Sequence, residues 1–456
     1  MAVQNPWRRT WKRSWKAIVK LKTSRSFDNF PEENYYQRYF WGKNCIFPGE
    51  TIISDLEIEV CFQMEKKSFQ SHAPGHLVDV CVGEYKAVAF VPDTLPPIGL
   101  EISETVTTQG LNAAVALGEL RGVGLLLPNP GLLITPFMRR EALLSSRIEG
   151  TQTSTKEVAI FELDGNESPD AHEVSNYVAA LNYGLKKVEQ GYPISLNVIL
   201  ELHRILMNNV RGKDKSPGRF RTIQNWIGTS HDIRKARFVP PPVSPINYVT
   251  TLMDNFEKYL NSGAERHPLL QAALMHYQFE AVHPFLDGNG RLGRLLVVLF
   301  LAERKLMPRP LLYLSAFFEK NRDAYTDALL AVSQQGAWEA WIQFFFQGVE
   351  EQARDAVTRS QHLVATWNRM REQVTQARSS SLTLSLIDKL FAWPAITIPK
   401  AAKLLDVQYP TAKNNIEKLV DAGILVLLEQ EKTGGARDYG KVYLCPEIIG
   451  VIEQEY

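Results

Sequence analysis

The stretch that decides the fold reads His283-Pro-Phe-Leu-Asp-Gly-Asn-Gly-Arg-Leu-Gly-Arg294 and continues at once into Leu-Leu-Val-Val-Leu-Phe-Leu-Ala. Glycines on both sides of Asn289 let the backbone turn and expose consecutive N–H groups as an anion-binding nest. The apolar run after the turn predicts a buried helix. The nest then lies at a helix N-terminus, where the helix dipole and the free N–H groups favour a phosphate.

Side chains in the same stretch predict nucleotide chemistry. Asp287 offers a hard oxygen ligand of the kind that Mg²⁺ prefers. Arg291 and Arg294 share one face of the expected helix, so they can bind different phosphates of one nucleotide. His283 is the side chain able to take up a proton near neutral pH, which makes it the candidate general base. The alternative is a glycine-rich turn between two core helices with surface arginines, which does not require these side chains together.

The stretch resembles the signature His-x-Phe-x-(Asp/Glu)-Gly-Asn-Gly-Arg-x-x-Arg of the Fic family of nucleotidyl transferases. The resemblance implies a mainly α fold, in which a β-hairpin flap covers an all-helical core. It implies transfer of AMP from ATP to a Ser, Thr or Tyr hydroxyl of a target protein, with pyrophosphate as leaving group. His283 would be the general base, Asp287 would hold Mg²⁺, and Phe285 would anchor the loop in the core. The implied phosphate contacts are Gly288, Asn289, Gly290, Arg291 and Arg294.

A second segment, Ser145-Ser-Arg-Ile-Glu-Gly150, resembles the inhibitory motif (Ser/Thr)-x-x-x-Glu-(Gly/Asn) of the same family. The resemblance implies that Glu149 pairs with Arg294 and removes the cation that the γ-phosphate of ATP needs. Ser145 would steady the inhibitory helix near the loop. Taken alone, the segment also fits an ordinary exposed helix end capped by Gly150.

A third region predicts the flap. Residues 222–227 and 236–239 are β-prone and flank a polar turn, so they predict a hairpin, which is either this flap or a plain surface feature. In Fic proteins a target segment adds to the flap as a further strand. Tyr325 either stacks on adenine, as the resemblance suggests, or packs in the core. The flap positions that would border nucleotide and target are Ile227, Gly228, Thr229 and Ser230.

The resemblance and the changes in composition divide the chain into five parts. Residues 1–83 open on a basic, aromatic run without the features of a signal peptide, and we expect a disordered leader, with binding to anionic surfaces or RNA as the alternative. Residues 84–175 resemble the Fic N-terminal domain, a proline-rich extended piece and two helices, the second ending in the inhibitory motif. Residues 176–350 form the expected catalytic core, and residues 351–380 a linking helix. Residues 381–456 form the expected C-terminal domain.

The C-terminal residues predict a winged helix-turn-helix. Two helices at 398–405 and 409–422 are joined by a short turn, and strands at 424–428 and 441–444 flank a wing at Gly434–Gly435. DNA contact would use polar and basic side chains of the second helix, but Glu417 and Asp421 dilute its charge. We therefore favour a module that docks protein or supports a homodimer over one that binds DNA. The side chains that would reach DNA are Lys413, Asn414, Asn415 and Lys418.

Composition sets the remaining bounds. The chain has 456 residues, 45% of them hydrophobic and 22% charged, with a formal net charge of +1. A nearly neutral chain has no overall attraction to nucleic acid or membrane, and its longest apolar run is too short to cross a bilayer. The four cysteines show no paired or metal-ligand spacing, which suits a reducing compartment, so we expect a cytoplasmic enzyme.

Two functions from different classes remain at this point. The first is an adenylyltransferase inhibited by its own Glu149, acting on target proteins and on itself. The second is a winged-helix transcriptional regulator whose Fic core senses ATP. His283 favours the enzyme because a sensor does not need a base. Removal of AMP from a modified target, with Glu149 orienting water, is left open as a further activity.

Overall fold

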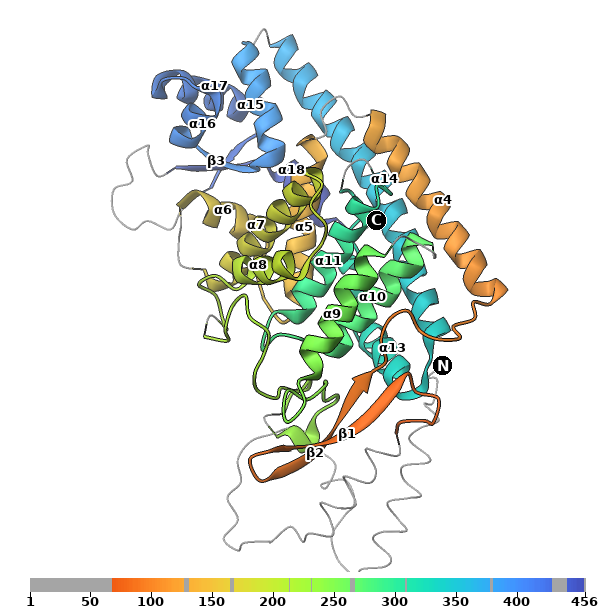
Figure 1. Cartoon of the computed structure of the whole chain (residues 1–456). Helices are drawn as coiled ribbons and strands as arrows, with labels where there is room; N and C mark the ends of the chain where they lie inside the picture. Colours follow the sequence, from red (N-terminus) through yellow and green to blue (C-terminus); the bar gives the residue numbers. More distant parts are fainter. Residues whose placement is uncertain are drawn as a thin grey trace, which may run out of the picture. The chain divides into compact units, whose positions relative to one another are not determined.

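The computed structural model describes residues 68–126, 131–164, 168–212, 214–230, 232–262, 267–307, 310–377, 380–428 and 441–454. These residues belong to the larger of two units of the chain, Leu56–Tyr456. They are mainly helical, with two small antiparallel sheets among them, which confirms the expected fold class (Figure 1). The expectations for the leader up to residue 67 and for the wing at residues 434–435 lie outside the described residues.

The described part begins with a hairpin that the sequence did not predict. Strand β1 (Gly75–Val82) pairs with β2 (Tyr85–Pro92), and Val82 lies opposite Tyr85. The expected boundary after residue 83 falls in the turn of this hairpin, so β1 belongs with the chain that follows it. Residues 93–103 form neither helix nor strand, and two helices come next: α4 (Glu104–Leu126) and α5 (Gly131–Ile148). The inhibitory motif lies at the end of α5, as the sequence indicated.

The central layer consists of helices that are buried on nearly every side. In α10 (Pro268–Val282) and α11 (Asn289–Glu303) almost all side chains are buried, because their apolar residues surround the whole helix. Between them lies the signature stretch. The helices around them are α6 (Thr155–Asp164), α7 (Pro169–Glu189), α8 (Leu196–Leu206), α9 (Tyr248–Asn261), α12 (Ser315–Lys320) and α13 (Arg322–Gln335).

A long helix connects this core with the C-terminal residues. Helix α14 (Trp338–Gln376) has 39 residues, so it begins within residues assigned to the core and ends close to the expected end of the linking helix. It packs along α4, as Figure 1 shows, and its buried face carries Trp341, Phe345 and Leu363. Farther along, α14 also packs against the C-terminal helices.

The C-terminal module contains the helices and strands expected of a winged helix-turn-helix. Its three strands are hydrogen-bonded in the order β3 (Ala395–Thr397), β5 (Val442–Leu444) and β4 (Val426–Leu427). One expectation is wrong: Asn415 does not face solvent, because its side chain is buried and its Oδ1 accepts a hydrogen bond from Thr383 at 2.6 Å. The elements are α15 (Ser381–Ala392), β3 (Ala395–Thr397), α16 (Ile398–Leu405), α17 (Tyr409–Asp421), β4 (Val426–Leu427), β5 (Val442–Leu444) and α18 (Pro446–Glu453).

The flap differs from the expected two-stranded hairpin. Its two sides meet in a single bridge between Ile227 and Phe238, and a short 3₁₀ helix, η1 (Ile233–Lys235), lies between them. The carbonyl of Val239 accepts from the N–H of Phe90 at the end of β2, so this side of the flap pairs with the N-terminal hairpin instead. Ile233 and Val239 also belong to a small apolar cluster with β1 and β2. The competing strand explains why residues 222–226 remain unpaired.

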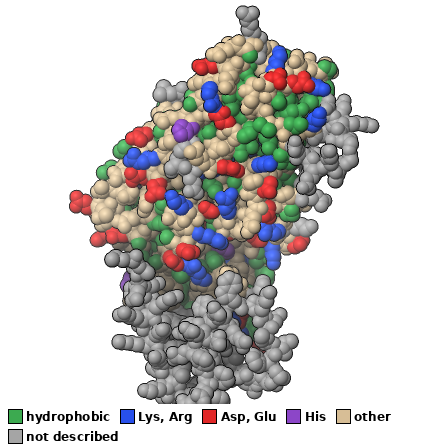
Figure 2. All heavy atoms as spheres, turned by 180° about the vertical axis from the view of Figure 1, so that it is seen from behind, with side chains coloured by type: hydrophobic (Ala, Val, Ile, Leu, Met, Phe, Trp, Pro, Cys, Tyr) green, Lys and Arg blue, Asp and Glu red, His purple; other side chains and the backbone are tan. Residues whose placement is uncertain are grey.

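Charged side chains of both signs are mixed on one face of the molecule. On the face drawn in Figure 2, Lys and Arg side chains alternate with Asp and Glu, and no large area carries one sign of charge. None of the helices in the described ranges is both long enough and apolar enough to cross a bilayer.

Candidate active site

His283 lies at the junction between α10 and the signature turn. It is the C-cap of α10, with φ of 47° in the left-handed region. Its carbonyl accepts from Nε of the buried Arg221 at 2.9 Å, and its Nδ1 lies 3.3 Å from the carbonyl of Glu280. Burial, aided by the charge of Arg221, lowers the pKa of His283 to about 4. The imidazole is therefore neutral at pH 7 and can accept a proton.

The turn after His283 is fixed by side chains that sit below it. Asn289 accepts from the N–H of Phe285 and donates to its carbonyl, both at 2.8 Å, so its amide closes the turn. The Phe285 ring is fully buried and stacks on His203 with ring centroids 3.8 Å apart. Nδ1 of His203 accepts from the N–H of Gly218, so Nε2 carries the proton and donates to the carbonyl of Asp287 at 3.0 Å.

Two glycines of the turn occupy positions where a side chain would not fit. Gly288 has φ of 78°, and an added Cβ would lie 2.7 Å from Sδ of Met207. An added Cβ on Gly290 would lie 2.2 Å from Oε1 of Glu149. A carboxylate therefore already occupies the space in front of the first turn of α11, where an anion is favoured.

Asp287 is the residue here that suits a metal ion. Its Oδ1 accepts from the N–H of Gly288 at 2.6 Å and lies 3.6 Å from Nη2 of Arg291, and its side chain is 42% exposed. The described residues contain no group of three or more His, Cys, Asp or Glu side chains that could hold a metal. Mg²⁺ commonly takes one or two carboxylates and completes its shell with water and substrate phosphates. Asp287 fits that type of site and does not fit an all-protein cage.

Arg294 and the inhibitory motif are in direct contact. Nη2 of Arg294 lies 2.6 Å from Oε1 of Glu149 and 2.9 Å from the carbonyl of Ser145, and its Nε donates to Oγ of Ser145 at 2.9 Å. Burial alone would raise the pKa of Glu149, but the charge and hydrogen bond of Arg294, together with the charges of Arg291 and His283, outweigh burial and lower that pKa. Glu149 is therefore ionised at neutral pH. Gly150 follows α5 with φ of 93°, which agrees with a helix end.

Arg291 makes a different ion pair. Its Nη1 lies 3.2 Å from Oε2 of Glu173 on α7, and both side chains are almost fully buried. Glu173 also accepts from Nε of Arg211 at 2.8 Å and from the hydroxyl of Thr151 at 2.8 Å. Arg291 is thus almost fully buried between Glu173 and Asp287, and its contact with a phosphate stays a prediction.

Sequence reasoning missed two further carboxylates. Burial raises the pKa of Glu280 on α10 to about 7, and an added Cβ on Gly293 would lie 2.3 Å from its Oε1. Glu141 on α5 is buried, and it accepts from the Ser315 hydroxyl at 2.5 Å and from Tyr177 Oη at 3.1 Å. For Glu280 the available signal was one acid within a mainly apolar helical stretch, whereas Glu141 directly follows two arginines and gave no such signal.

The structure places Tyr325 in the core. Its side chain is buried, its ring stacks on Phe318 at 4.4 Å, and its hydroxyl lies 2.8 Å from Nε2 of His276. The core-packing alternative therefore describes this residue better than stacking on adenine.

The flap is anchored beside the signature turn. Nδ2 of Asn225 donates to the carbonyl of Phe285 at 2.9 Å, and the indole N–H of Trp226 donates to the carbonyl of Ser230 at 2.9 Å. Gly228 and Thr229 are exposed, which leaves them accessible to a partner.

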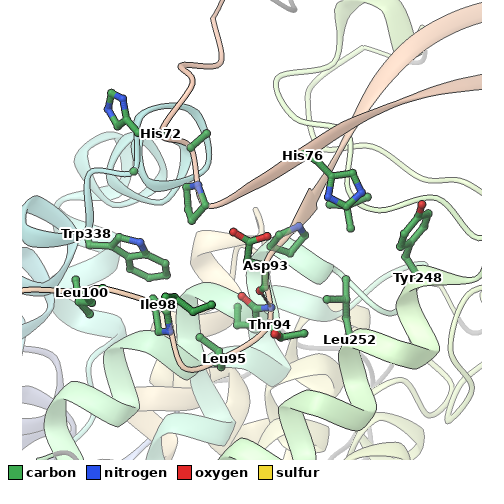
Figure 3. A pocket seen from close by; sticks show the side chains of 18 of the residues that line it. His72, His76, Asp93, Thr94, Leu95, Ile98, Leu100, Tyr248, Leu252 and Trp338 are labelled. Carbon is green, nitrogen blue, oxygen red and sulfur yellow. Dashed lines mark hydrogen bonds between the residues drawn. The ribbon is translucent and has the colours of Figure 1, made fainter.

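A separate cavity of about 730 Å³ lies under the N-terminal hairpin, lined by Asp93 and Trp338 among others. No residue of the signature or inhibitory motifs lines it (Figure 3).

Comparison with known proteins agrees with this geometry. Residues 108–186 match the model of the Fic/DOC family N-terminal region, and residues 193–301 match that of the Fic/DOC family. The chain is 35% identical over 157 residues to the protein adenylyltransferase Fic of Drosophila ananassae, covering 33% of this chain and 29% of that protein. The same identity and share of this chain hold for the Drosophila grimshawi protein, 30% of which is covered. The chain thus spans less than a third of the curated relatives it matches.

Two solved structures are also similar. A Fic family protein from Desulfovibrio desulfuricans is 20% identical with a TM-score of 0.48, and the match covers 76% of this chain and 97% of that one. A Fic domain-containing signaling protein from Bacteroides thetaiotaomicron is 20% identical with a TM-score of 0.44, covering 56% and 98%. The two family matches meet between α7 and α8 and include both the signature stretch and the inhibitory motif. Residues 108–301 are therefore similar to the Fic/DOC N-terminal region and to the Fic/DOC domain that follows it.

Proposed function

We propose that this protein transfers AMP from ATP to a hydroxyl group of a target protein. The observation that carries the proposal is the Glu149 carboxylate, which is bound to Arg294 in front of α11 while a neutral His283 stands at the other end of the turn. A carboxylate in this position mimics a phosphate oxygen. The Drosophila relatives are named as adenylyltransferases, which supports the choice of reaction.

The reaction needs a base and a firm hold on the phosphates. The target hydroxyl loses its proton to His283, its oxygen forms a bond to the α-phosphorus, and the bond to the β-phosphate oxygen breaks. Pyrophosphate leaves with the electron pair. The N-terminus of α11 binds phosphate oxygens through its N–H groups, and Arg294 binds the γ-phosphate. Mg²⁺ held by Asp287 would neutralise phosphate charge when bound.

In the described conformation Glu149 inhibits the enzyme. Arg294 cannot pair fully with a carboxylate and a γ-phosphate at one place, so ATP binds in full only when Glu149 moves away. The similarity to the Fic/DOC N-terminal region and the approach of Glu149 to Gly290 both support this role.

The target is a hydroxyl-bearing protein segment, and the enzyme itself is one such target. We propose that the segment docks along residues 227–230 of the flap, where Gly228 and Thr229 are exposed beside the turn.

We also propose that the chain is divided into an N-terminal domain, a catalytic core, a linking helix and a C-terminal module that docks protein. The buried Asn415 weakens the alternative of a DNA-binding regulator, and the cytoplasm remains the proposed location.

The test is the Glu149→Gly variant, incubated with ATP labelled at the α-phosphate and a cell lysate. We expect labelling of protein, including the enzyme itself, to exceed that of the wild type by roughly ten- to a thousandfold, because a partly enclosed Arg–carboxylate pair is worth a few kcal/mol at most. Glu149→Gly combined with Arg294→Ala is the control and should lose the gain. Label from the γ-phosphate should not be transferred. Equal labelling of Glu149→Gly and the wild type would refute inhibition by Glu149.

A further inference from the structure

We propose that the C-terminal module holds the inhibitory helix in place, with Arg139 and Arg140 as the positioning residues through which it acts on Glu149. This inference rests on the proposed function, since it concerns the regulation of the same site. Both arginines lie on α5, and Glu149 directly follows that helix. At 1.5 Å per residue, Arg139 is about 15 Å from Glu149 along the helix axis.

Arg139 connects α5 with two other elements although it is almost fully buried. Its Nη1 donates to the carbonyl of Ala392, the last residue of α15, and its Nη2 pairs with Glu162 on α6. Its guanidinium lies 5.1 Å from the ring centroid of Trp393, which follows α15. A cation at the C-terminal end of a helix is favoured by the helix dipole. A buried arginine therefore ties the inhibitory helix to the first helix of the module.

Arg140 begins a second connection, to the last helix of the module. It lies 3.6 Å from Asp355 on α14, and Asp355 pairs with Nη2 of Arg359 at 2.9 Å. Arg359 is 1% exposed and donates to carbonyls at the end of α18, at 3.1 Å for Ile452 and 2.8 Å for Gln454. The connection from α5 to α18 thus runs from Arg140 through Asp355 to the buried Arg359.

The segment on the far side of Glu149 is tied to the module as well. Helix α6 begins shortly after Glu149, and the N–H of Thr155 at its start donates to Oε1 of Glu453 on α18 at 3.2 Å. Helix α6 also packs against β3. The module therefore contacts the chain both before and after the inhibitory glutamate.

These contacts affect Glu149 because its carboxylate is held mainly by its contact with Arg294. The Glu149 side chain is 40% exposed, and its Oε1 lies 2.6 Å from Nη2 of Arg294. A displacement of the end of α5 by about 1 Å would lengthen the contact between Glu149 and Arg294 beyond hydrogen-bonding distance. Helix α5 packs on the core helices α7, α11 and α12 and on α15 and α18 of the module. A change in the module would thus reach Glu149 through α5, whereas contacts that only stabilise the fold would leave the activity unchanged.

The experiment compares Arg139→Met and Arg140→Ala in two backgrounds, the wild type and Glu149→Gly, with AMP transfer as the readout. Arg139→Met keeps an aliphatic chain in the buried site. Arg354→Ala is the matched control, because Arg354 neighbours Asp355 on α14 but pairs only within that helix, with Glu350 at 3.1 Å. Melting curves identify variants that fail to fold.

In the wild-type background we expect Arg139→Met and Arg140→Ala to raise AMP transfer by about three- to thirtyfold, and Arg354→Ala to leave it unchanged. In the Glu149→Gly background neither should add to the gain, because the restraint they release is already absent. An equal gain in both backgrounds, or no gain in the wild type while Glu149→Gly is active, would overturn the inference.

A binding measurement keeps the inference testable if the proposed reaction is wrong. The ratio of ADP to ATP dissociation constants reports whether Arg294 is free to bind a γ-phosphate. Both variants should raise this ratio in the wild-type background and not in Glu149→Gly. An unchanged ratio overturns the inference even if no AMP transfer is found, whereas a raised ratio without transfer supports it and refutes only the proposed reaction.

Discussion

The two arginines of α11 are both paired with a glutamate, but the two pairs differ in access. Arg291 and Glu173 are 4% and 3% exposed, and Glu173 has further partners that fix it from the other side. Arg294 is 2% exposed, while its partner Glu149 is 40% exposed. A solute can displace Glu149 without opening the core, and it cannot displace Glu173. The difference shows how one helix face can carry a structural ion pair and an exchangeable one within a single turn.

The largest expected effect is on AMP transfer and concerns His283, the proposed base of the reaction that the pair between Glu149 and Arg294 restrains. In the Glu149→Gly background, His283→Ala should lower AMP transfer by about 10²- to 10⁴-fold, the usual contribution of a positioned base. ATP affinity should stay within about twofold, because the turn and Arg294 are retained. Radiolabel transfer and calorimetric titration of ATP measure the two quantities. Full activity without His283 would mean that Glu149 restrains some other chemistry.

The next effect separates the pairs by stability. Glu173→Ala leaves Arg291 buried without its charge partner and should cost about 3–5 kcal/mol of unfolding free energy. Glu149→Ala should cost about 1 kcal/mol or less, because water can enter the exposed space and hydrate Arg294. Urea unfolding of both variants gives the values. Similar losses for the two variants would remove the distinction between a structural and an exchangeable pair.

The signature stretch could be predicted in detail because its function is encoded locally. The turn and the helix that follows it could be predicted from the glycine and apolar spacing within residues 283–294, whereas the contacts of His283 with Arg221 and of Phe285 with His203 could not. The contact between Glu149 and Arg294 spans 145 positions and was available only through the family resemblance.

Tertiary competition decided the elements that sequence reasoning got wrong. Residues 222–227 and 236–239 have the composition of a hairpin, but β2 takes the hydrogen-bonding edge at Val239, and local propensity carries no trace of that partner. For Tyr325 the sequence left stacking on adenine and core packing open, and its contact with His276 shows that it packs in the core. Glu173 is one acid on the buried face of α7, and its pairing with Arg291 depends on how α7 packs on α11.

The smallest expected effect is a shift in the pKa of His283, which distinguishes the carboxylate of Glu149 from that of Glu173. Burial and the charge of Arg221 lower the pKa of His283 to about 4, while Glu149 raises it slightly and Glu173 is not among the groups that affect it. An NMR titration of the imidazole should show no protonation between pH 8 and about 5.5, with His283→Ala assigning the signal. Glu149→Gly should lower the midpoint further, and Glu173→Gln should leave it in place.

The same pKa fixes the sign of a stability effect. The unfolded chain takes up this proton near pH 6.5, and the folded protein refuses it until about pH 4, so the contribution of His283 to stability is lost as the pH falls through that window. A midpoint near 6.5 in the folded protein would mean that the imidazole is open to water. The imidazole would then be neutral only because of the solution pH, and not because burial lowers its pKa. The pair between Glu149 and Arg294 would no longer restrain a site whose base is already neutral.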